Sequence, residues 1–544
     1  MISEHPHMFM GRDALWDLLG KRLQGLKEGY RQNVAIVGPK TLGKTSLLTK
    51  WVYEHDDPQV VMVYLDLDSR DADFFISQFV RSLLYHYLKS AKLPLQEDAH
   101  VLCASAKEHI PQTAAVAENI LSLLAQQQWD QAYAGLLSLP EVFSNETKKY
   151  VVLIIDEFHC LGQYPITNVY AELGRRIMTQ KNCMYVLTSS YRAKAEEIIA
   201  QKLSLLFGHF EVIELEPLDG MHSIKLLEYH LQDIKCGLHL KNFLADFTGG
   251  HPLYINILGH ELVALSGIHG QKEIYAPLLT AAFENVLFNP WGVLNRHFEL
   301  TVHDLCKGKS DGPLVATLMA LSMGHHRLNE LTEALHIKSA QVTQRLQGLM
   351  AADLVAKNGN FFYIKDKLFK YWIKYVQQRR LKGMDLEAGR SRKLFKEEIN
   401  KSLNDYISIA RKDLSSRMVD LLHRCGQETF DMNGRRYKLA DFREVTPIKL
   451  RLGAGSFMDA ILADTPDGRW VVVLKKDPVL EGEINALLEE TKRMMPKPSR
   501  CVIVSLSGFD DNAKIRALEE KCWVWREQEL NMLMHLYDQP GILR

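Results

Sequence analysis

The sequence predicts an α/β protein of several domains, in which residues 1–215 form a parallel sheet covered by helices. In this region short β-rich apolar runs, such as NVAIVG and YVVLIIDEF, alternate with longer segments of helical period. That alternation is typical of a parallel sheet with helices on both faces. The 544 residues suffice for three or four domains of about 150 residues each. Apolar residues make up 47% and charged residues 24%, which excludes disorder as the main state.

The charge balance, the apolar runs and the cysteine pattern indicate in which cellular compartment the chain is expected. Lys plus Arg (66) equals Asp plus Glu (66), so any basic surface must be local. Apolar runs such as VVLII at 151–155 are far shorter than the ~20 residues of a bilayer span. The first residues also lack the basic start and apolar core of a signal peptide. Eight cysteines are scattered without a CxxC pair, so we expect a reduced, cytoplasmic chain without membrane partner, zinc ribbon or disulfide framework.

The segment GPKTLGKT at 38–45 fits the phosphate-loop pattern GxxxxGK[ST], between the strand NVAIV and the helical pattern SLLTKWV. Gly38 and Gly43 let the backbone turn its N–H groups toward phosphates at a helix N-terminus. Lys44 would reach the β- and γ-phosphates, and the Thr45 hydroxyl would ligate magnesium. The sequence therefore predicts ATP and Mg²⁺ as cofactors, with the nucleotide bound by Gly38, Pro39, Lys40, Thr41, Leu42, Gly43, Lys44, Thr45 and Ser46.

A second half of the site follows a later strand. YVVLIIDEF ends in two acids, Asp156 and Glu157, about 110 residues after the loop. Asp156 is placed to hold magnesium through water, and Glu157 to polarise the attacking water as a general base. With Lys44 and Glu157 as catalytic residues, the pattern favours hydrolysis over binding alone.

Five motifs in this order resemble a known family: FMGRD at 9–13, the phosphate loop, DEF at 156–158, VLTSS at 186–190 and GGHP at 249–252. They resemble the signal-transduction ATPases with numerous domains, the STAND class of AAA+-related proteins. The chain is more closely similar to archaeal-type ATPases, which join such a module to a winged helix and a nuclease-like C-terminal domain. The resemblance covers nearly the whole chain.

The resemblance implies roles for the flanking motifs. Phe9, Met10 and Arg12 would lie near the adenine, and His251 and Pro252 would belong to a helical lid. FMGRD also fits a simple helix entry, and GGHP fits a helix stop followed by a proline start.

The resemblance also assigns Ser189 or Ser190 to the sensor position that reads the γ-phosphate, where some relatives carry a basic residue. Arg175, Arg176 and Arg192 are candidates to supply that missing charge. For each of the three taken individually, a solvated helix face is the favoured interpretation.

Residues 216–310 have a helical pattern, the expected lid, and residues 311–380 predict a winged helix. In the third helix of the latter, Val342, Leu346 and Leu349 share one apolar face. Two strands with a turn at 358–360 would form the wing. The polar residues expected to point outward, toward a DNA groove or toward a packing partner, are Lys338, Ser339, Gln341, Gln344 and Arg345.

The stretch 365–382, KDKLFKYWIKYVQQRRLK, is rich in basic residues. Four aromatic residues interleave with them: Phe369, Tyr371, Trp372 and Tyr375. This favours a surface that contacts the DNA backbone. The alternative is a helix whose aromatic side belongs to the core.

After a polar linker at 380–393, residues 390–544 resemble a restriction-endonuclease-like α/β domain, with a hairpin whose turn is TPDG. In that fold an Asp on one strand and a (D/E)xK motif on the next form the catalytic centre. Asp459 fits the Asp and Lys475 the Lys, but Val473 stands where the acid is needed.

Valine cannot coordinate a metal, so we expect a degenerate domain that does not cut DNA. Glu397, Glu398 or Glu483 could supply a displaced carboxylate, but nothing in the sequence singles one out.

The sequence thus predicts an ATP-binding, slowly hydrolysing switch that couples nucleotide state to a winged helix and a nuclease-like domain. One alternative is an ATP-gated DNA nuclease in defence or mobile-element control. Another is an ATP-dependent DNA-binding regulator. ATP or ADP, DNA, a protein trigger and nucleotide-dependent self-association are the partners compatible with these interpretations.

Overall fold

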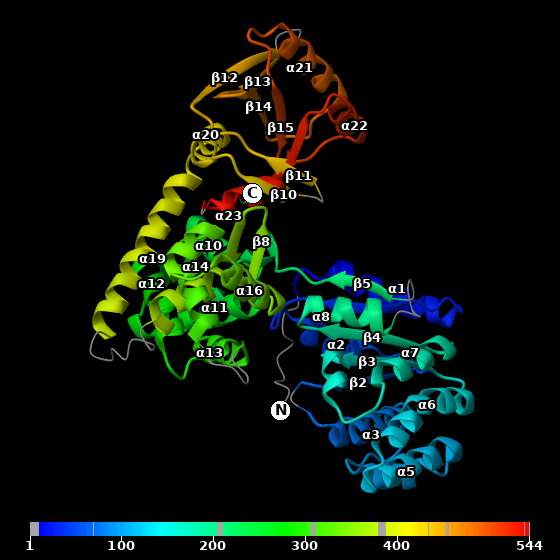
Figure 1. Ribbon diagram of the computed structural model, residues 1–544. Helices are drawn as coiled ribbons and strands as arrows, with labels where there is room; N and C mark the ends of the chain where they lie inside the picture. Colours follow the sequence, from blue (N-terminus) through cyan, green and yellow to red (C-terminus); the bar gives the residue numbers. More distant parts are fainter. Residues whose placement is uncertain are drawn as a thin grey trace. The chain divides into compact units, whose positions relative to one another are not determined.

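The computed structural model describes residues 10–68, 70–203, 210–305, 312–378, 388–432, 435–452, 456–537 and 539–542 (Figure 1). The chain divides into two compact units, each described by itself. The first comprises Met1–His222 and His251–Leu253, and the second Ser223–Gly250 and Tyr254–Arg544. Within the described ranges no helix has the length and apolar character to cross a membrane.

The first unit contains the predicted parallel sheet, so the α/β fold class is confirmed. Its five strands are all parallel, in the order β2-β3-β4-β1-β5. They are β1 (Asn33–Val37), β2 (Val60–Asp66), β3 (Tyr150–Asp156), β4 (Cys183–Ser189) and β5 (Phe210–Glu214).

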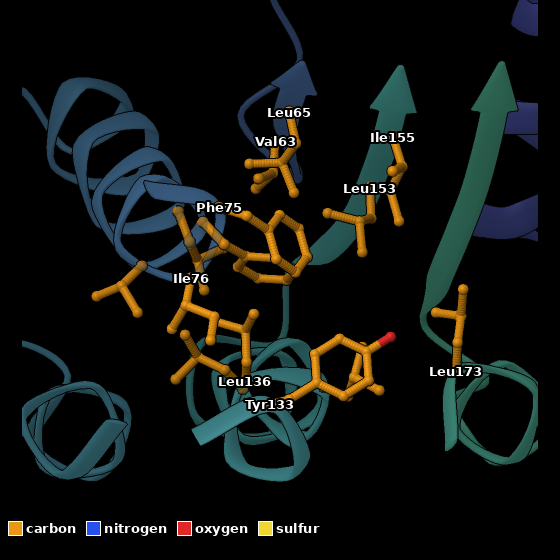
Figure 2. Packing of buried hydrophobic residues seen from close by; sticks show 14 of the residues in the cluster. Val63, Leu65, Phe75, Ile76, Tyr133, Leu136, Leu153, Ile155 and Leu173 are labelled. Atoms are coloured by element: carbon orange, nitrogen blue, oxygen red, sulfur yellow. The ribbon is translucent and has the colours of Figure 1, made fainter. Parts of the chain in front are cut away.

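Alternate side chains of this sheet enter two cores. One core packs under α1 (Asp13–Lys27) and α2 (Lys44–Glu54). The other is covered mainly by α3 (Ala72–Ser90), α4 (Ala99–Ala106), α5 (Pro111–Ala125), α6 (Trp129–Thr147) and α7 (Val169–Thr179). Figure 2 shows side chains of α3 and α6 facing those of β2 and β3 in this second core. Burial on both faces explains why the strands read as continuous apolar runs.

Because parallel strands point the same way, the segments that follow β1, β3 and β4 emerge at one edge of the sheet. Val37 is paired with Ser189, and Ile155 with Leu187. After the strands come the phosphate loop, the 3-10 helix η1 (Phe158–Gln163), and α8 (Arg192–Glu197) with the π-helical turn η2 (Ile198–Lys202). This edge therefore gathers the loop, the acid pair and the serine pair.

The region after β5 is helical, as its pattern indicates. It contains α9 (Gly220–Leu231), α10 (Leu238–Phe247), α11 (Pro252–His269), α12 (Ala276–Phe288) and α13 (Val293–Leu305). A short parallel pair, β6 (Lys235–Cys236) and β7 (Glu273–Ile274), ties two of the connections together.

Three short helices and a hairpin follow in the second unit. They are α14 (Gly312–Ser322), α15 (Leu328–Leu335), α16 (Ser339–Ala351), and the antiparallel strands β8 (Val355–Asn358) and β9 (Phe361–Ile364). Val342, Leu346 and Leu349 are buried, as the apolar face of α16 predicts. Next come α17 (Lys367–Trp372) and the π-helical turn η4 (Ile373–Gln377).

The C-terminal region is built on a second five-stranded sheet, in the order β12-β13-β14-β15-β16. Strands β12 (Glu444–Leu452), β13 (Ser456–Thr465) and β14 (Gly468–Lys475) are antiparallel, whereas β15 (Arg500–Ser505) and β16 (Trp523–Arg526) continue parallel to β14. The hairpin with the TPDG turn is β13–β14.

Helices cover both sides of this sheet. On one side lie α20 (Leu414–Arg424), the hairpin β10 (Thr429–Met432) and β11 (Arg435–Lys438), and α23 (Glu527–Leu536). On the other side lie α21 (Glu481–Arg493) and α22 (Asp511–Glu519). The long α19 (Ala388–Ala410) precedes α20 and packs on α12 and α10.

Candidate nucleotide-binding site

Backbone geometry at the phosphate loop requires its glycines. Gly43 has a φ of 95°, in the left-handed region that favours glycine, and α2 begins at the next residue. A Cβ on Gly38 would lie 2.7 Å from the carbonyl oxygen of Leu215, so the backbone just after β5 leaves room only for glycine there. The loop thus turns sharply from β1 into the N-terminus of α2, where backbone N–H groups are free to receive an anion.

The Lys44 side chain is folded back into this loop. It is 4% exposed, and its ammonium donates to three oxygens: the carbonyls of Gly38 (2.7 Å) and Pro39 (2.9 Å) and the Ser190 hydroxyl (3.2 Å). Burial lowers the pKa of Lys44, and the neighbouring Glu157 opposes that shift. The cation is therefore held at the loop, where an incoming phosphate can replace a carbonyl as its partner.

Asp156 is the acceptor for three hydroxyl groups. Its carboxylate receives hydrogen bonds from Thr45 (2.6 Å), Tyr64 (2.7 Å) and Thr188, and the residue is 1% exposed. Burial, followed by the charge of Asp156, raises the pKa of Tyr64, so this phenol stays protonated and remains a donor. Three converging donors fix the carboxylate beside the first turn of α2.

The oxygens at this point suit Mg²⁺, which prefers hard ligands and keeps much of its water. Thr45 supplies a hydroxyl and Asp156 a carboxylate, 2.6 Å apart. Among the residues that the structure describes, no group of three or more His, Cys, Asp or Glu could hold a metal.

Glu157 is held in a strained position by several hydrogen-bonding partners. Its φ of 57° lies in the left-handed region, which is uncommon for a residue other than glycine. Ser190 donates to both carboxylate oxygens, through its backbone N–H (2.8 Å) and its hydroxyl, and His159 Nδ1 lies 3.3 Å from one of them. Burial raises the pKa of Glu157, while the Ser190 hydroxyl and Lys44 oppose the rise.

The two serines after β4 face different partners. The Ser189 hydroxyl contacts His159 Nδ1 (3.0 Å) and the Tyr191 carbonyl (3.3 Å). Ser190 instead lies between Lys44 and Glu157. Of the two, Ser190 is therefore the serine that could sense a phosphate through Lys44.

His159 belongs to this network although its role could not be read from the sequence. It is 4% exposed and stacks edge-on against Tyr191, with ring centroids 5.0 Å apart. Burial lowers the pKa of His159 to about 4, helped by Lys194. The imidazole is thus neutral at physiological pH. The only sequence signal is its position three residues after Asp156, in DEFH.

Arg12 lies against the loop, whereas Phe9 is outside the described residues. The guanidinium donates to the Leu42 carbonyl at 3.4 Å, and Met10 is half-buried. Burial lowers the pKa of Arg12 and Glu216 opposes the shift. A role of Met10 and Arg12 near the adenine stays a prediction.

Two residues beside the N-terminal segment, His222 and Asp219, were not predicted from the sequence. A Cβ on Gly11 would come within 2.8 Å of the His222 ring, and His222 Nδ1 lies 2.9 Å from the Asp219 carboxylate. Glycine at position 11, with a φ of 69°, lets the N-terminal segment pass this pair closely.

The GGHP motif reaches the tip of the loop. His251 Nε2 lies 3.2 Å from the Thr41 hydroxyl. Gly249 and Gly250 both have positive φ, 60° and 72°, and α11 starts at Pro252. The motif is thus a helix stop and a proline start that also brings His251 to the phosphate loop.

The three arginines proposed to compensate phosphate charge have carboxylate partners. Arg175 and Arg176 bind Glu172, at 3.0 Å and 3.4 Å. Arg192 binds Glu196 at 2.8 Å and also contacts Glu214. The arrangement favours the surface alternative for all three side chains.

In the C-terminal sheet, Asp459 and Lys475 lie on opposite faces, so the expectation that they share one centre is wrong. β13 and β14 pair continuously from Asp459 opposite Leu474 to the turn. Directly paired residues share a face, and successive residues alternate. Asp459 therefore lies on the face of Leu474, and Lys475 on the face of Val473. The two faces bury separate cores, with Leu474 in one and Val473 in the other.

Lys475 has its own carboxylate partner. Its ammonium lies 2.6 Å from both oxygens of Glu483, at the start of α21. Glu398 interacts with Tyr375, and Glu397 is exposed on α19. A displaced carboxylate thus stands beside Lys475, but on the face away from Asp459.

The basic stretch at 365–382 is not an open surface over the part that the structure describes. Residues 366–378 are all buried or half-buried, and Phe369 and Trp372 are core residues. Lys367 pairs with Asp246 at 2.8 Å. The aromatic side chains of α17 therefore belong to the core, as the alternative interpretation states. Residues 379–382 lie outside the described residues.

The outward face of α16 is polar but carries little positive charge. Lys338, Ser339, Gln341 and Gln344 are exposed. Arg345 is half-buried, and its guanidinium reaches the Pro313 carbonyl at 3.4 Å. One exposed cation in this set gives weak electrostatic attraction for DNA.

The loop between β1 and α2, the strand order and the acid at the end of β3 define the first unit as a P-loop nucleotide-binding fold.

No known protein family and no curated protein matches the chain. Solved structures with a similar fold include a Walker-type ATPase of Pyrococcus abyssi, 14% identical, with 68% of this chain and 97% of that chain covered and a TM-score of 0.47. The Aeropyrum pernix ORC2 protein in ADPNP–ADP complexes is 13% identical, with 74% and 97% covered and a TM-score of 0.44. The Thermotoga maritima RuvB branch migration motor is 14% identical, with 67% and 96% covered and a TM-score of 0.34. These likenesses concern the fold alone.

Proposed function

We propose that the chain binds ATP with Mg²⁺ and hydrolyses it slowly, as a cytoplasmic molecular switch of the STAND type. The observation that carries the proposal is the convergence of Lys44, Asp156 and Glu157 at one sheet edge, where the Ser190 hydroxyl joins Lys44 to Glu157. A phosphate-binding cation, a metal-binding oxygen pair and a base are the three parts that phosphoryl transfer to water needs.

Each residue then has a defined task. Lys44 exchanges its loop carbonyls for phosphate oxygens, and Thr45 and Asp156 hold the magnesium. The metal, when bound, offsets phosphate charge and orients the phosphates. Glu157 accepts a proton from the attacking water.

Slow turnover follows from the bonds that Glu157 already makes. Both of its oxygens accept from Ser190. Hydrogen bonds to a carboxylate stabilise its ionised form, so they make Glu157 a weaker base toward water. A long-lived bound nucleotide suits a switch.

The GGHP segment would transmit the nucleotide state from the phosphate loop to the helices that follow. His251 touches Thr41 of the loop, and the same segment covalently joins α10 to α11. Movement of the loop would be passed to these helices, and through them to the winged helix (α14–β9) and the restriction-endonuclease-like domain. A protein trigger and nucleotide-dependent self-association are further parts of this proposal.

Two variants test the proposal. Lys44→Ala should abolish ATP binding, measured by titration with a fluorescent ATP analogue, because the loop loses the buried cation that would contact the β- and γ-phosphates. Glu157→Gln should keep binding but slow phosphate release about a hundredfold, since general-base assistance contributes roughly 10²–10⁴. Unchanged affinity in the first variant would refute the site, and turnover within twofold of wild type in the second would assign another base.

DNA binding is the second candidate function. The polar exposed face of α16 supports it, and the single exposed cation of that face counts against tight binding. Fluorescence anisotropy with duplex DNA across a salt series would decide, because backbone contacts weaken steeply with salt. DNA cleavage is not supported, because Asp459 and Lys475 occupy opposite faces.

A further inference from the structure

Two cysteines that are far apart in the sequence lie side by side in the C-terminal sheet. Cys501 is the second residue of β15, and Cys522 immediately precedes β16. The parallel pairing of these strands begins with Val502 opposite Trp523, so the preceding residues, 501 and 522, are neighbours across the strands. Cys522 belongs to a buried cluster and the half-buried Cys501 packs against the same cluster, so their side chains share one face of the sheet.

This placement meets the reach of a disulfide. Neighbouring strands are separated by about 4.8 Å, within the roughly 4.4–6.8 Å range of Cα separations that disulfides show. Both cysteines are free thiols, and the proximity of each thiol shifts the pKa of the other. Cys501 is half-buried, so solvent reaches the pair from its side, whereas Cys522 is 4% exposed.

The surroundings make Cys522 the better nucleophile. The hydrogen bond from Cys501 lowers the pKa of Cys522, although burial and Glu520 oppose the shift, and the cation of Arg500 acts in the same direction as the bond. Arg500 is held nearby, with its guanidinium 4.9 Å from the centre of the Trp523 ring. A thiolate beside a second thiol is the arrangement that oxidation converts to a disulfide.

We propose that Cys501 and Cys522 form a reversible disulfide on exposure to a peroxide, which makes the β15–β16 edge an oxidation-sensitive modification site. The Cys522 thiolate attacks one peroxide oxygen, the O–O bond breaks, and a sulfenic acid and hydroxide form. Cys501 then attacks the Cys522 sulfur; the S–S bond forms, the S–O bond breaks, and water leaves. The hydroxide takes up the proton that Cys522 lost at the start and becomes a second water. The two thiols together lose two electrons, and these electrons reduce the peroxide.

The bond would be readily reversible. Solvent reaches the pair from the side of Cys501, and exposed disulfides have the higher reduction potentials of labile, regulatory bonds. The ring closed by the bond contains α22, which lies between β15 and β16 in the chain. Oxidation would therefore link β16, the strand that precedes α23, covalently to β15.

The test uses the native full-length chain treated with about ten equivalents of hydrogen peroxide, followed by alkylation and trypsin. Trypsin places the two cysteines in separate peptides, 501–514 and 522–526, and each of these contains a single cysteine. We expect more than half of the chains to yield the two peptides cross-linked, at about 2 Da below their summed mass because two hydrogens are lost. Dithiothreitol should restore both alkylatable thiols.

Three matched variants complete the test. Cys501→Ser and Cys522→Ser should each abolish the cross-link, whereas Cys236→Ser should leave it unchanged, because Cys236 is a half-buried thiol in another part of the second unit. Recovery of both peptides as separate alkylated or sulfinic species from the wild-type chain would overturn the proposal. A cross-link between two molecules instead of within one would also overturn it. Oxidising a mixture of isotopically labelled and unlabelled chains would show such a cross-link as one labelled and one unlabelled peptide joined together. Circular dichroism checks that each variant is folded.

Discussion

Replacing Ser190 by alanine removes the one hydroxyl that joins Lys44 to Glu157. In the structure this hydroxyl accepts from Lys44 at 3.2 Å and donates to one oxygen of Glu157. The backbone N–H of the same residue still donates to the other oxygen, at 2.8 Å, so the carboxylate keeps one of its two anchors. The substitution therefore loosens Glu157 without removing it from the site.

The expected effect on turnover can be worked from that single bond. A hydrogen bond to a charged group contributes about 1.5–3 kcal/mol. Because this bond stabilises the ionised carboxylate, it weakens Glu157 as a base and slows hydrolysis, and each ~1.4 kcal/mol is worth tenfold in rate. Taking the low end, because the N–H anchor remains, we expect Ser190→Ala to raise basal ATP turnover about tenfold. ATP affinity should change less than threefold, since Lys44 keeps two carbonyl partners.

Single-turnover and steady-state phosphate release, with ATP affinity measured separately, test this expectation. Ser189→Ala is the matched control, because that hydroxyl contacts His159 and the Tyr191 carbonyl instead of Lys44. A double variant, Ser190→Ala with Glu157→Gln, should lose the gain. A tenfold fall in turnover for Ser190→Ala alone would refute the reasoning, because it would mean that the hydroxyl assists the reaction itself.

Two further predictions concern single bonds. Tyr64→Phe removes one of three donors to Asp156. At ~1 kcal/mol per bond, it should weaken the apparent Mg²⁺ affinity about fivefold in a magnesium titration of turnover. Tyr150→Phe, on the same sheet, is the control, and equal effects of the two substitutions would contradict the assignment. Lys367→Ala leaves the buried carboxylate of Asp246 without its cation and should lower the free energy of unfolding by about 1–3 kcal/mol in urea. The folded-state pKa of Asp246 is lowered, through Lys367 against the opposing effect of burial, so this stabilisation is present above the unfolded-state pKa and is lost as pH falls through the folded one. The wild-type advantage over Lys367→Ala should therefore shrink on acidification, and a constant difference would refute the pairing.

The arrangement of the candidate nucleotide site was predictable because it depends on sequence order and parallel pairing. A loop after one strand and an acid at the end of another must meet when both strands are parallel, and Thr45 does reach Asp156. The choice between Ser189 and Ser190 was not predictable. Side chains alternate between the two faces of a sheet only within a strand, and Ser190 lies just after the end of β4. His159 was missed for a related reason: its contact with Glu157 depends on the left-handed backbone at Glu157, which no motif encodes.

The basic aromatic stretch shows a different limit. Composition cannot say which side of a helix is covered, and Phe369 and Trp372 proved to be core residues. The cysteine pair shows a third limit, because spacing alone cannot bring residues 501 and 522 together. Only the register of β15 with β16 does so.

The register of β13 and β14 also determines what an acid introduced at position 473 could do. Val473→Glu would return the missing carboxylate two residues before Lys475, but on the face opposite Asp459, so the two acids could not share a metal. Val473 is fully buried, and Lys475 is already paired with Glu483, so the new charge would be only partly compensated. We expect a loss of about 2–4 kcal/mol in the free energy of unfolding and no nicking of supercoiled plasmid with magnesium or manganese. Val473→Gln separates the effect of charge from that of volume. Nicking that appears in Val473→Glu and disappears when Asp459→Ala is added would show that both acids reach one metal, and the pairing of β13 with β14 described above would then be incorrect.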